Sequence, residues 1–487
     1  MKQIIFALTL LVALANNGMS QNTLTNETAR LADKGQFKEA AIKLNEAIAS
    51  SKLSPDEKKS AELQLDILHR IREDYTTSAD GLFGDLKQEI KGLTREEFDG
   101  WVKAGWFDAR EIDGKFLFFD SSYENLWYRH PELVARRNNP PDNSAREHWR
   151  LEVLTAIQKA AVAEHTPYVL PKTFEVTMWV AANADLVPAG EIVRTWIPIP
   201  RRYPFQDGFK LLASSPSPRT INPQESPIRA IYFEQLAQKG VPTRCQIQYQ
   251  YTAHGVYFDL NPAKIQPYDA KDETVRDFTG ESPHVIFTPE IKALSAKIVG
   301  NETNPMLKAK KIYDYLSDTL QYSYATEYST VPNLSDYTRS HGYGDCGEQG
   351  MLFITLCRYN GVPARWQSGW NLTPRDTSNH DWAEIYLAPY GWVPVDQYMG
   401  NYAMRYIKSL TADEKKEVRD FYFGGLDQYR MIANSDHSIA LNPAKQWPRS
   451  DDVDFQRGEV ETKDRNLYLG EFSYKLDYKE LPTPAMP

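Results

Sequence analysis

Apolar residues recur with helical spacing in the first part of the chain. Between residues 29 and 74 they share one face of a helix: Phe37, Ala40, Ala41, Leu44, Ala47 and Ile48. Ser54 followed by Pro55 is typical of the cap and first turn of a second helix. The pattern therefore predicts a helical hairpin in this region.

The spacing changes to two in the region 172–262. Apolar and polar side chains alternate in two runs, with the apolar positions Phe174, Val176, Met178, Val180, Cys245, Ile247, Tyr249 and Tyr251. Alternation of this kind is the pattern of strands with one buried face. We expect an antiparallel β-sandwich, in which Cys245 is a small core residue.

Helical spacing returns over residues 283–321 and in the apolar run 351–359, which Gly361 ends. Two strands are predicted next, at 380–387 and 392–396. The short turn between them contains proline and glycine, so we expect the two strands to form a hairpin.

The first twenty residues have the pattern of a secretory signal peptide. A positive residue precedes an apolar run from Ile4 to Ala15, and Gly18 and Ser20 are small residues at positions −3 and −1 of a cut before Gln21. The run is too short to span a bilayer, and no later stretch is long and apolar enough. We expect an exported protein, periplasmic or extracellular, that does not span the membrane.

Composition and charge narrow the function classes. The 487 residues carry a formal net charge of −9, from 56 basic and 65 acidic side chains. This is the wrong sign for a protein that binds nucleic acid through phosphate contacts. The sequence contains no metal-ligand spacing, phosphate loop or dinucleotide fingerprint, so we expect no metal and no cofactor. Three cysteines are too few for a disulfide scaffold.

Cys346 stands out among the three cysteines. It lies between Gly344 and Gly347, at the start of the predicted helix 346–359. The unpaired amides and the dipole at a helix N-terminus favour a thiolate over a thiol. Cys357, eleven residues further along the same helix, is beyond disulfide reach and is predicted to pack in the core. Cys346 is therefore a candidate nucleophile in the thiolate form.

A thiol nucleophile works with an oriented histidine. His380 opens the first strand of the predicted hairpin and Asp396 ends the second, so the hairpin brings the two close together. Asp381 is expected to project from the opposite face of the strand, and His341 lies in a glycine-rich loop, so Asp396 is the preferred partner and His380 the preferred base. The sequence thus predicts the catalytic set Cys346, His380 and Asp396.

Three blocks of sequence resemble the core of the transglutaminase-like superfamily. The first is Gly344-Asp345-Cys346-Gly347 with the helix that leads to Gly361-Val362-Pro363-Ala364-Arg365, the second is His380-Asp381-Trp382-Ala383-Glu384, and the third is Gly391-Trp392-Val393-Pro394-Val395-Asp396. The resemblance covers about residues 285–400. It implies a papain-like core, in which the helix that carries the nucleophile Cys346 packs on a sheet that carries the base His380 and the orienting Asp396.

With this resemblance the chain is expected to be an α+β protein with a papain-like transglutaminase core, preceded by an antiparallel β-sandwich and a helical N-terminal region. The expected segments are a signal peptide (1–20), a mostly helical region (21–165), the sandwich (170–265), the catalytic core (280–400) and an extended C-terminal segment packing on the core (401–487).

No short motif specifies the second oxyanion donor or the substrate groove. Acyl transfer needs a second donor to the oxyanion besides the Cys346 amide, and Tyr324 and Gln321 are the candidates. Trp370, Trp366 and Tyr343 flank the motifs and are candidates for a substrate groove, with core packing as the competing interpretation.

The expected substrate is a peptide or protein amide. A cysteine acyl-enzyme intermediate passes the acyl group to water or to an amine, and hydrolysis by a peptidase, amidase or deamidase is favoured over cross-linking by a protein-glutamine γ-glutamyltransferase. A non-catalytic exported binding or scaffold protein is the alternative from another class. The helical N-terminus is expected to contact a protein partner.

Overall fold

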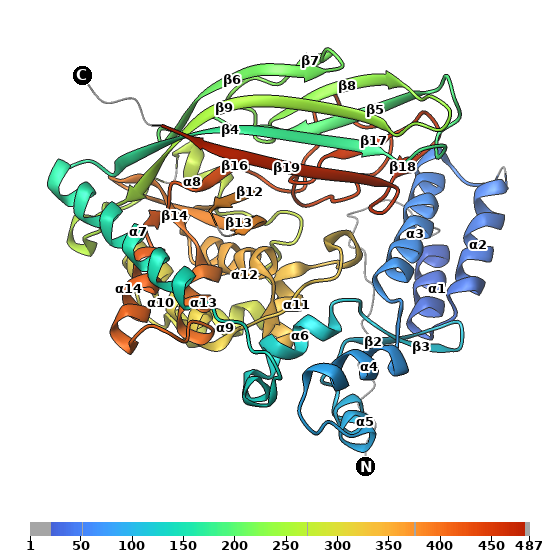
Figure 1. The fold of residues 1–487 in the computed structure, drawn as a ribbon, viewed down its shortest axis with the longest axis horizontal. Coiled ribbons are helices and arrows are strands. Elements are labelled where there is room, and N and C mark those ends of the chain that lie inside the picture. Colours follow the sequence, from blue (N-terminus) through green and yellow to red (C-terminus); the bar gives the residue numbers. More distant parts are fainter. Residues whose placement is uncertain (1–20, 51, 270, 375, 483–487) are drawn as a thin grey trace. The chain divides into compact units, whose positions relative to one another are not determined.

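The computed structural model describes residues 21–50, 52–269, 271–374 and 376–482, so the predicted signal peptide lies outside the described residues. The chain divides into two compact units (Figure 1). The first comprises residues 1–141 and 323–332, and the second comprises residues 142–322 and 333–487. None of the helices in the described part of the chain combines the length and the apolar surface that a bilayer crossing requires.

The first unit is mostly helical, with the elements α1 (Gln21–Asp33), α2 (Phe37–Ala49), α3 (Pro55–Asp74), β1 (Thr77–Ser78), α4 (Ala79–Glu89), α5 (Arg95–Ala104), β2 (Ala109–Ile112), β3 (Lys115–Phe118), α6 (Ser122–Arg129), η1 (Pro131–Arg136) and η3 (Tyr328–Thr330). The predicted hairpin is α2 and α3. Phe37, Ala40 and Leu44 are fully buried between its helices. Ser54 caps α3 in a capping box with Glu57.

The N-terminal part of the second unit contains α7 (Ser144–Glu164), β4 (Tyr168–Ala182), β5 (Ile192–Pro198), β6 (Gln206–Ser215), β7 (Thr220–Ile221), β8 (Ala230–Leu236), β9 (Thr243–Tyr257), η2 (Pro262–Lys264) and α8 (Glu273–Asp277). Its C-terminal part contains α9 (Pro289–Val299), α10 (Pro305–Thr319), β10 (Gln321–Tyr322), α11 (Leu334–His341), β11 (Tyr343–Gly344), α12 (Cys346–Tyr359), β12 (Ala364–Thr373), β13 (Asp376–Leu387), β14 (Gly391–Val395), α13 (Gln397–Arg405), α14 (Ala412–Phe421), β15 (Gly425–Leu426), β16 (Arg430–Asn434), β17 (Glu459–Glu461), β18 (Asn466–Leu467) and β19 (Phe472–Leu481).

Two five-stranded sheets share one hydrophobic core. One has the order β15-β9-β4-β19 with β6 also paired to β9, and the other has the order β18-β17-β5-β8-β7. The alternating apolar residues of β4 and β9, including Cys245, are buried in this core. The period-two pattern thus positions the faces that pack together.

The C-terminal segment differs from the expected extended chain that packs on the core. It contains most of α13 and all of α14, and its strands complete both sheets of the sandwich. β19 pairs with β4 from Phe472 opposite Ala182 to Leu481 opposite Thr173. The sequence analysis did not single out this strand, although its apolar and polar residues alternate as in β4 and β9, with Lys475 and Lys479 on the open face.

The helical N-terminal region also differs in extent from the expected 21–165, because α7 belongs to the second unit. Ile157 of α7 approaches β9 so closely that a Cβ added to Gly255 would lie 2.6 Å from it. The glycine is what allows the helix to pack directly on the strand.

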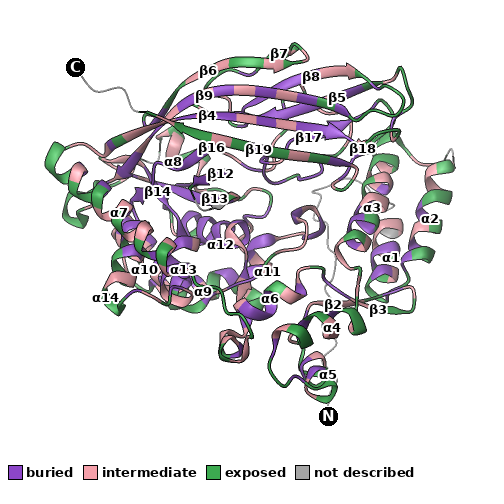
Figure 2. Ribbon diagram, in the orientation of Figure 1, coloured by how far each residue is buried: buried purple, intermediate pink, exposed green. Residues whose placement is uncertain are grey.

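Within the second unit, α12 packs on a four-stranded sheet of order β14-β13-β12-β16. In Figure 1, β12 and β13 lie between α12 and the long strands β4, β9 and β19 of the sandwich. Nearly every residue of α12 is buried (Figure 2), since sheet and helices surround it. This central helix carries the candidate nucleophile at its first position.

Candidate active site

Cys346 is the first residue of α12, and the turn before it is held tightly. The Asp345 carboxylate accepts a hydrogen bond from the Glu348 amide at 2.9 Å, and the Glu348 carboxylate accepts one from the Asp345 amide at 3.2 Å. A Cβ on Gly344 would lie 2.8 Å from the Glu348 side chain, so glycine is required there. The capping box therefore fixes where the helix starts and where the thiol lies.

The thiol lies against the strand that carries His380. The Cys346 Sγ donates to Asp381 Oδ2 at 3.4 Å and accepts from the Asp381 backbone amide. Asp381, which was expected only to project from the opposite face of the strand to His380, is therefore the residue that contacts the thiol. β14 pairs with β13 only from Ala383 to Leu387, which leaves the edge of β13 at Asp381 open to the start of α12.

The thiolate expected at the helix terminus is also not supported. Burial raises the pKa of the Cys346 thiol well above its ordinary value, and the charges of Asp381 and Asp345 raise it further. Burial and the two carboxyl groups beside the sulfur thus outweigh the helix dipole, whose effect is small. At neutral pH Cys346 is a thiol.

We expect iodoacetamide to label Cys346 no faster than glutathione at pH 7, because the reactive thiolate is scarce. The labelling rate should rise with pH beyond the point where glutathione levels off. Mass spectrometry of the native protein at several pH values measures this. Cys245 and Cys357 are internal controls: both are buried with a pKa raised by burial, to about 11 for Cys245, so neither should react before unfolding.

His380 and Asp396 form a buried pair. His380 Nε2 lies 2.8 Å from Asp396 Oδ2, and the two side chains are 2% and 0% exposed. Because a carboxylate only accepts, the imidazole proton lies on Nε2 and Nδ1 keeps its lone pair. Burial lowers the pKa of His380 despite the carboxylate, so the ring is neutral and able to take a proton.

Asp396 is held by three partners. Besides His380, it accepts from the Met399 amide at 3.0 Å, which caps α13, and from Arg430 at 2.9 Å. Burial opposes its charge, but His380 and Arg430 outweigh this and lower the pKa of Asp396 to about 2. Asp396 is therefore ionised throughout the neutral range.

Arg430 was missed by the sequence reasoning. It comes from β16, also binds Asp427 at 3.2 Å, and lies 5.0 Å from the centre of the Trp382 ring. A charged residue at the head of the apolar strand 430–434 is the signal that points to a buried ion pair.

The structure brings the thiol and the His380–Asp396 pair to the same stretch of β13. Among the described residues the hydrogen bonds of Cys346 go to Asp381, and none joins its sulfur to His380. Glu384, further along the strand, binds Arg365 at 2.7 Å. His341 is exposed and stacks on Tyr337, so it is not part of the site.

The two oxyanion candidates separate. Gln321 lies in β10, which pairs in parallel with β11, and its backbone carbonyl accepts from Gln349 of α12 at 3.3 Å. Tyr324 belongs to the first unit, where its backbone amide donates to Asn125 at 2.6 Å. Gln321 is therefore next to the nucleophile's helix, and both residues stay candidates for the second oxyanion donor.

The two groove tryptophans are packing residues. Trp366 is 0% exposed, and Trp370 is 5% exposed in the core of the sandwich, with its indole donating to the Gln456 carbonyl at 3.0 Å. Their flanking position along the chain was misleading, because β12 is buried on both faces. Tyr343, in β11, is half-buried and stays a candidate for the groove.

Comparisons with known proteins show which family the region around Cys346, His380 and Asp396 resembles. The family model of the transglutaminase-like superfamily matches residues 292–397. The chain is 24% identical over 237 residues to an uncharacterized protein of Haemophilus influenzae, covering 42% of this chain and 63% of that protein. It is 28% identical over 129 residues to the uncharacterized protein YebA of Bacillus subtilis, covering 23% of this chain and 17% of YebA. The chain thus spans less than two thirds of the curated relatives it matches.

Among solved structures, a protein of Cytophaga hutchinsonii proposed to be a cysteine protease aligns with 65% of this chain and 93% of its own. The sequence identity is 14% and the TM-score is 0.40. The family match spans the helix that begins at Cys346 and the hairpin that contains His380 and Asp396. Residues 292–397 therefore form a transglutaminase-like domain.

Proposed function

We propose that this chain is a thiol enzyme that hydrolyses an amide of a peptide or protein through a Cys346 acyl-enzyme intermediate. Cys346 is the nucleophile, His380 the base and Asp396 the carboxylate that orients the imidazole. The observation that carries the proposal is the buried 2.8 Å contact of His380 with Asp396, on the strand against which the thiol lies. The match of this segment to a transglutaminase-like domain supports it.

The protonation states define the first step. Cys346 starts as a thiol and His380 as a neutral ring with Nδ1 free of the bond to Asp396. The thiol leaves Asp381, passes its proton to Nδ1, and the sulfur attacks the carbonyl carbon. Asp396 then stabilises the imidazolium, which protonates the leaving amine. A water molecule, activated by His380, releases the acyl group from sulfur.

Hydrolysis is proposed over transfer to an amine. Water is always present, whereas nothing in the sequence selects an amine. The discriminating experiment incubates the protein with glutamine-containing peptides, with and without a labelled primary amine, and analyses the products by mass spectrometry. Peptide cleavage or conversion of glutamine to glutamate without amine incorporation supports hydrolysis. Incorporation of the amine in place of hydrolysis supports a protein-glutamine γ-glutamyltransferase.

The alternative of a non-catalytic binding protein is tested in the same assay. The Cys346→Ala protein is the control, since it keeps every surface except the sulfur. A binding or scaffold protein would show no difference between the two proteins in any assay.

Export is part of the proposal. The signal-peptide pattern at residues 1–20 supports a periplasmic or extracellular protein. Determining the N-terminus of the mature protein tests it, with Gln21 as the expected first residue. Retention of Met1 in the mature protein would argue against export by this route.

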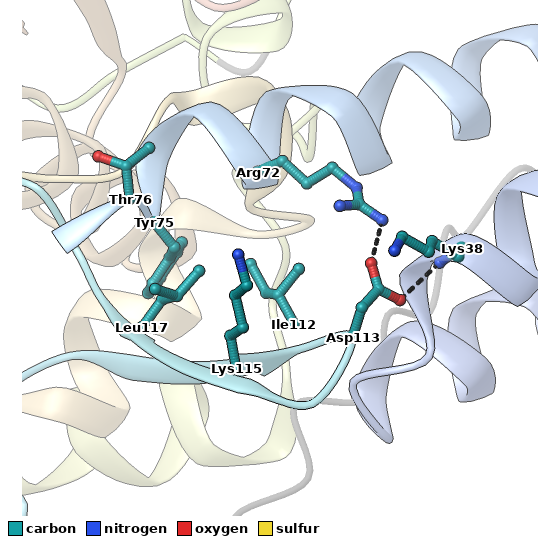
Figure 3. Close-up of a pocket in the computed structure, with 8 residues that line it drawn as sticks. All are labelled: Lys38, Arg72, Tyr75, Thr76, Ile112, Asp113, Lys115 and Leu117. Atoms are coloured by element: carbon teal, nitrogen blue, oxygen red, sulfur yellow. Dashed lines mark hydrogen bonds and ion pairs between the residues drawn. The ribbon is translucent and has the colours of Figure 1, made fainter. Parts of the chain in front are cut away.

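A partner is proposed for the first unit. A cavity of about 390 Å³ lies between the end of α3 and the β2–β3 hairpin (Figure 3). Three cations, Lys38, Arg72 and Lys115, line it with one carboxylate, Asp113, which already accepts from Arg72 and from the Lys38 amide. The excess of positive charge suits an acidic group of a protein partner. Binding should weaken with salt and in Lys115→Ala.

A further inference from the structure

A loop beyond the family match contacts Asp381, the residue that bonds to the Cys346 sulfur. The loop of residues 449–458, between β16 and β17, contains Gln456, which is 5% exposed. Its side-chain nitrogen donates to Asp381 Oδ1 at 2.6 Å and to the His380 backbone carbonyl at 3.0 Å. One amide group therefore uses both of its protons on two neighbouring residues of β13, the proposed base and the residue that contacts the thiol.

The other side of the same contact belongs to Cys346. Asp381 presents Oδ1 to Gln456 and Oδ2 to the Cys346 sulfur, which lies 3.4 Å away. Asp381 is 4% exposed, so its carboxyl has little freedom to turn. The position of the thiol is thus linked through Asp381 to the Gln456 amide.

The loop that presents Gln456 is itself anchored. The Gln456 carbonyl accepts from the Trp370 indole of β12 at 3.0 Å. The neighbouring Phe455 carbonyl accepts from Asn434 of β16 at 3.0 Å, and the Phe455 ring packs in a cluster with Trp196 and Tyr232 of the sandwich. These contacts fix the position of Gln456 relative to the sheet of β12 and β16 and to the sheet of β5 and β8.

We propose that Gln456 is a positioning residue for the nucleophile, which holds the Asp381 carboxyl and the His380 main chain so that the Cys346 thiol stays against β13, the strand that carries the imidazole. This inference rests on the proposed function, and it adds to the site a residue 59 positions past the end of the family match at residue 397. Gln456 acts through Asp381 and touches no reacting atom.

The carboxyl that Gln456 holds lies among other charged groups. Asp345 and Cys346 act on it from the start of α12, and Asp454 and Asp451 act on it from the loop. Burial raises the pKa of Asp381 well above its ordinary value, as do the charges of Asp345 and Asp451. Burial also raises the pKa of Asp454, which bonds to Asp381, and the charge of Asp451 raises it further. Arg449 and Arg457 balance the charge of Asp451.

The test compares three full-length variants: Gln456→Ala, Gln456→Glu and the matched control Gln446→Ala, whose side chain is exposed on the same segment. We expect Gln456→Ala to lower kcat about 10- to 100-fold with little change in KM, because a displaced thiol affects chemistry more than binding. The rate of Cys346 alkylation at pH 7.5 should rise severalfold, since Asp381 no longer holds the thiol. Gln446→Ala should match the wild type in both.

Gln456→Glu distinguishes positioning from mere stability. This substitution places a second carboxyl group against Asp381. The two carboxyl groups repel each other when both are charged and form a hydrogen bond when they share a proton. Its kcat relative to the wild type should therefore recover as the pH falls. A kcat for Gln456→Ala within about twofold of the wild type would overturn the inference, as would a Gln456→Glu defect that does not vary with pH. The alkylation rate of Cys346 tests the role of Gln456 without any substrate. The proposed function is tested separately, because an active Cys346→Ala protein would contradict it without affecting the alkylation result.

Discussion

Replacing Cys346 by alanine is expected to reduce amide turnover by about 10⁴-fold or more, because the acyl-enzyme intermediate can no longer form. The substitution removes one sulfur atom at the start of α12 and leaves the capping box of Asp345 and Glu348 in place. The protein should therefore fold as the wild type does. Turnover of the substrate found in the peptide screen measures the loss, and the melting temperature checks the fold.

The matched control is Cys357→Ala on the same helix. Cys357 is fully buried and lies eleven residues from Cys346, so this variant loses packing but not the nucleophile. We expect it to be less stable by about 1–2 kcal/mol and to keep its turnover per folded molecule. Equal activity of Cys346→Ala and Cys357→Ala would refute Cys346 as the nucleophile.

Replacing Asp396 by asparagine should affect both activity and stability. Turnover should fall by about 10⁴-fold, since an amide no longer fixes the imidazole proton on Nε2 or stabilises the imidazolium. Arg430 would keep Asp427 but lose its bond to Asp396, and such loss of a buried partner costs about 3 kcal/mol. Chemical denaturation and steady-state kinetics measure the two effects, with Asp413→Asn, whose side chain is 92% exposed, as the control.

The stability of the protein is expected to depend on pH through Asp396. The pKa of Asp396 is lowered to about 2, from an ordinary value of 3.8. A carboxylate with a lowered pKa stabilises the folded protein above its ordinary pKa and loses that contribution as the pH falls toward its folded value. The wild type should therefore lose stability between about pH 4 and pH 2, and Asp396→Asn should lose less over the same range. Identical acid profiles of the two proteins would contradict the ionised pair.

Local patterns predicted the helix of Cys346, the hairpin of His380 and the alternating strands of the sandwich. Each of these depends on residues close together in the chain, such as Gly361 at the end of α12. The fold class follows from these elements, and the transglutaminase-like domain was recognised by the resemblance of three sequence blocks within them to that superfamily.

The errors arose where distant segments meet. The thiolate was expected from the helix terminus alone, but burial raises the thiol pKa, and Asp381, 35 positions away, lies against the sulfur and raises it further. Trp366 and Trp370 flank the motifs yet face the core, because β12 is the central neighbour of β13 and β16. Arg430 and Gln456 belong to no short motif, so only the folded structure connects them with Asp396 and Asp381.

The pairing of β19 with β4 has a consequence for the order of assembly. A fragment that stops near residue 400 contains the whole family match and all three proposed catalytic residues. It nevertheless lacks β16, β17 and β19, so β12 and β4 each lose a neighbouring strand and Asp396 loses Arg430. During synthesis, we therefore expect the active site to assemble only after the ribosome has released the later strands β16, β17 and β19. A nascent chain consequently carries the sequence of the site well before it has a site that is able to work.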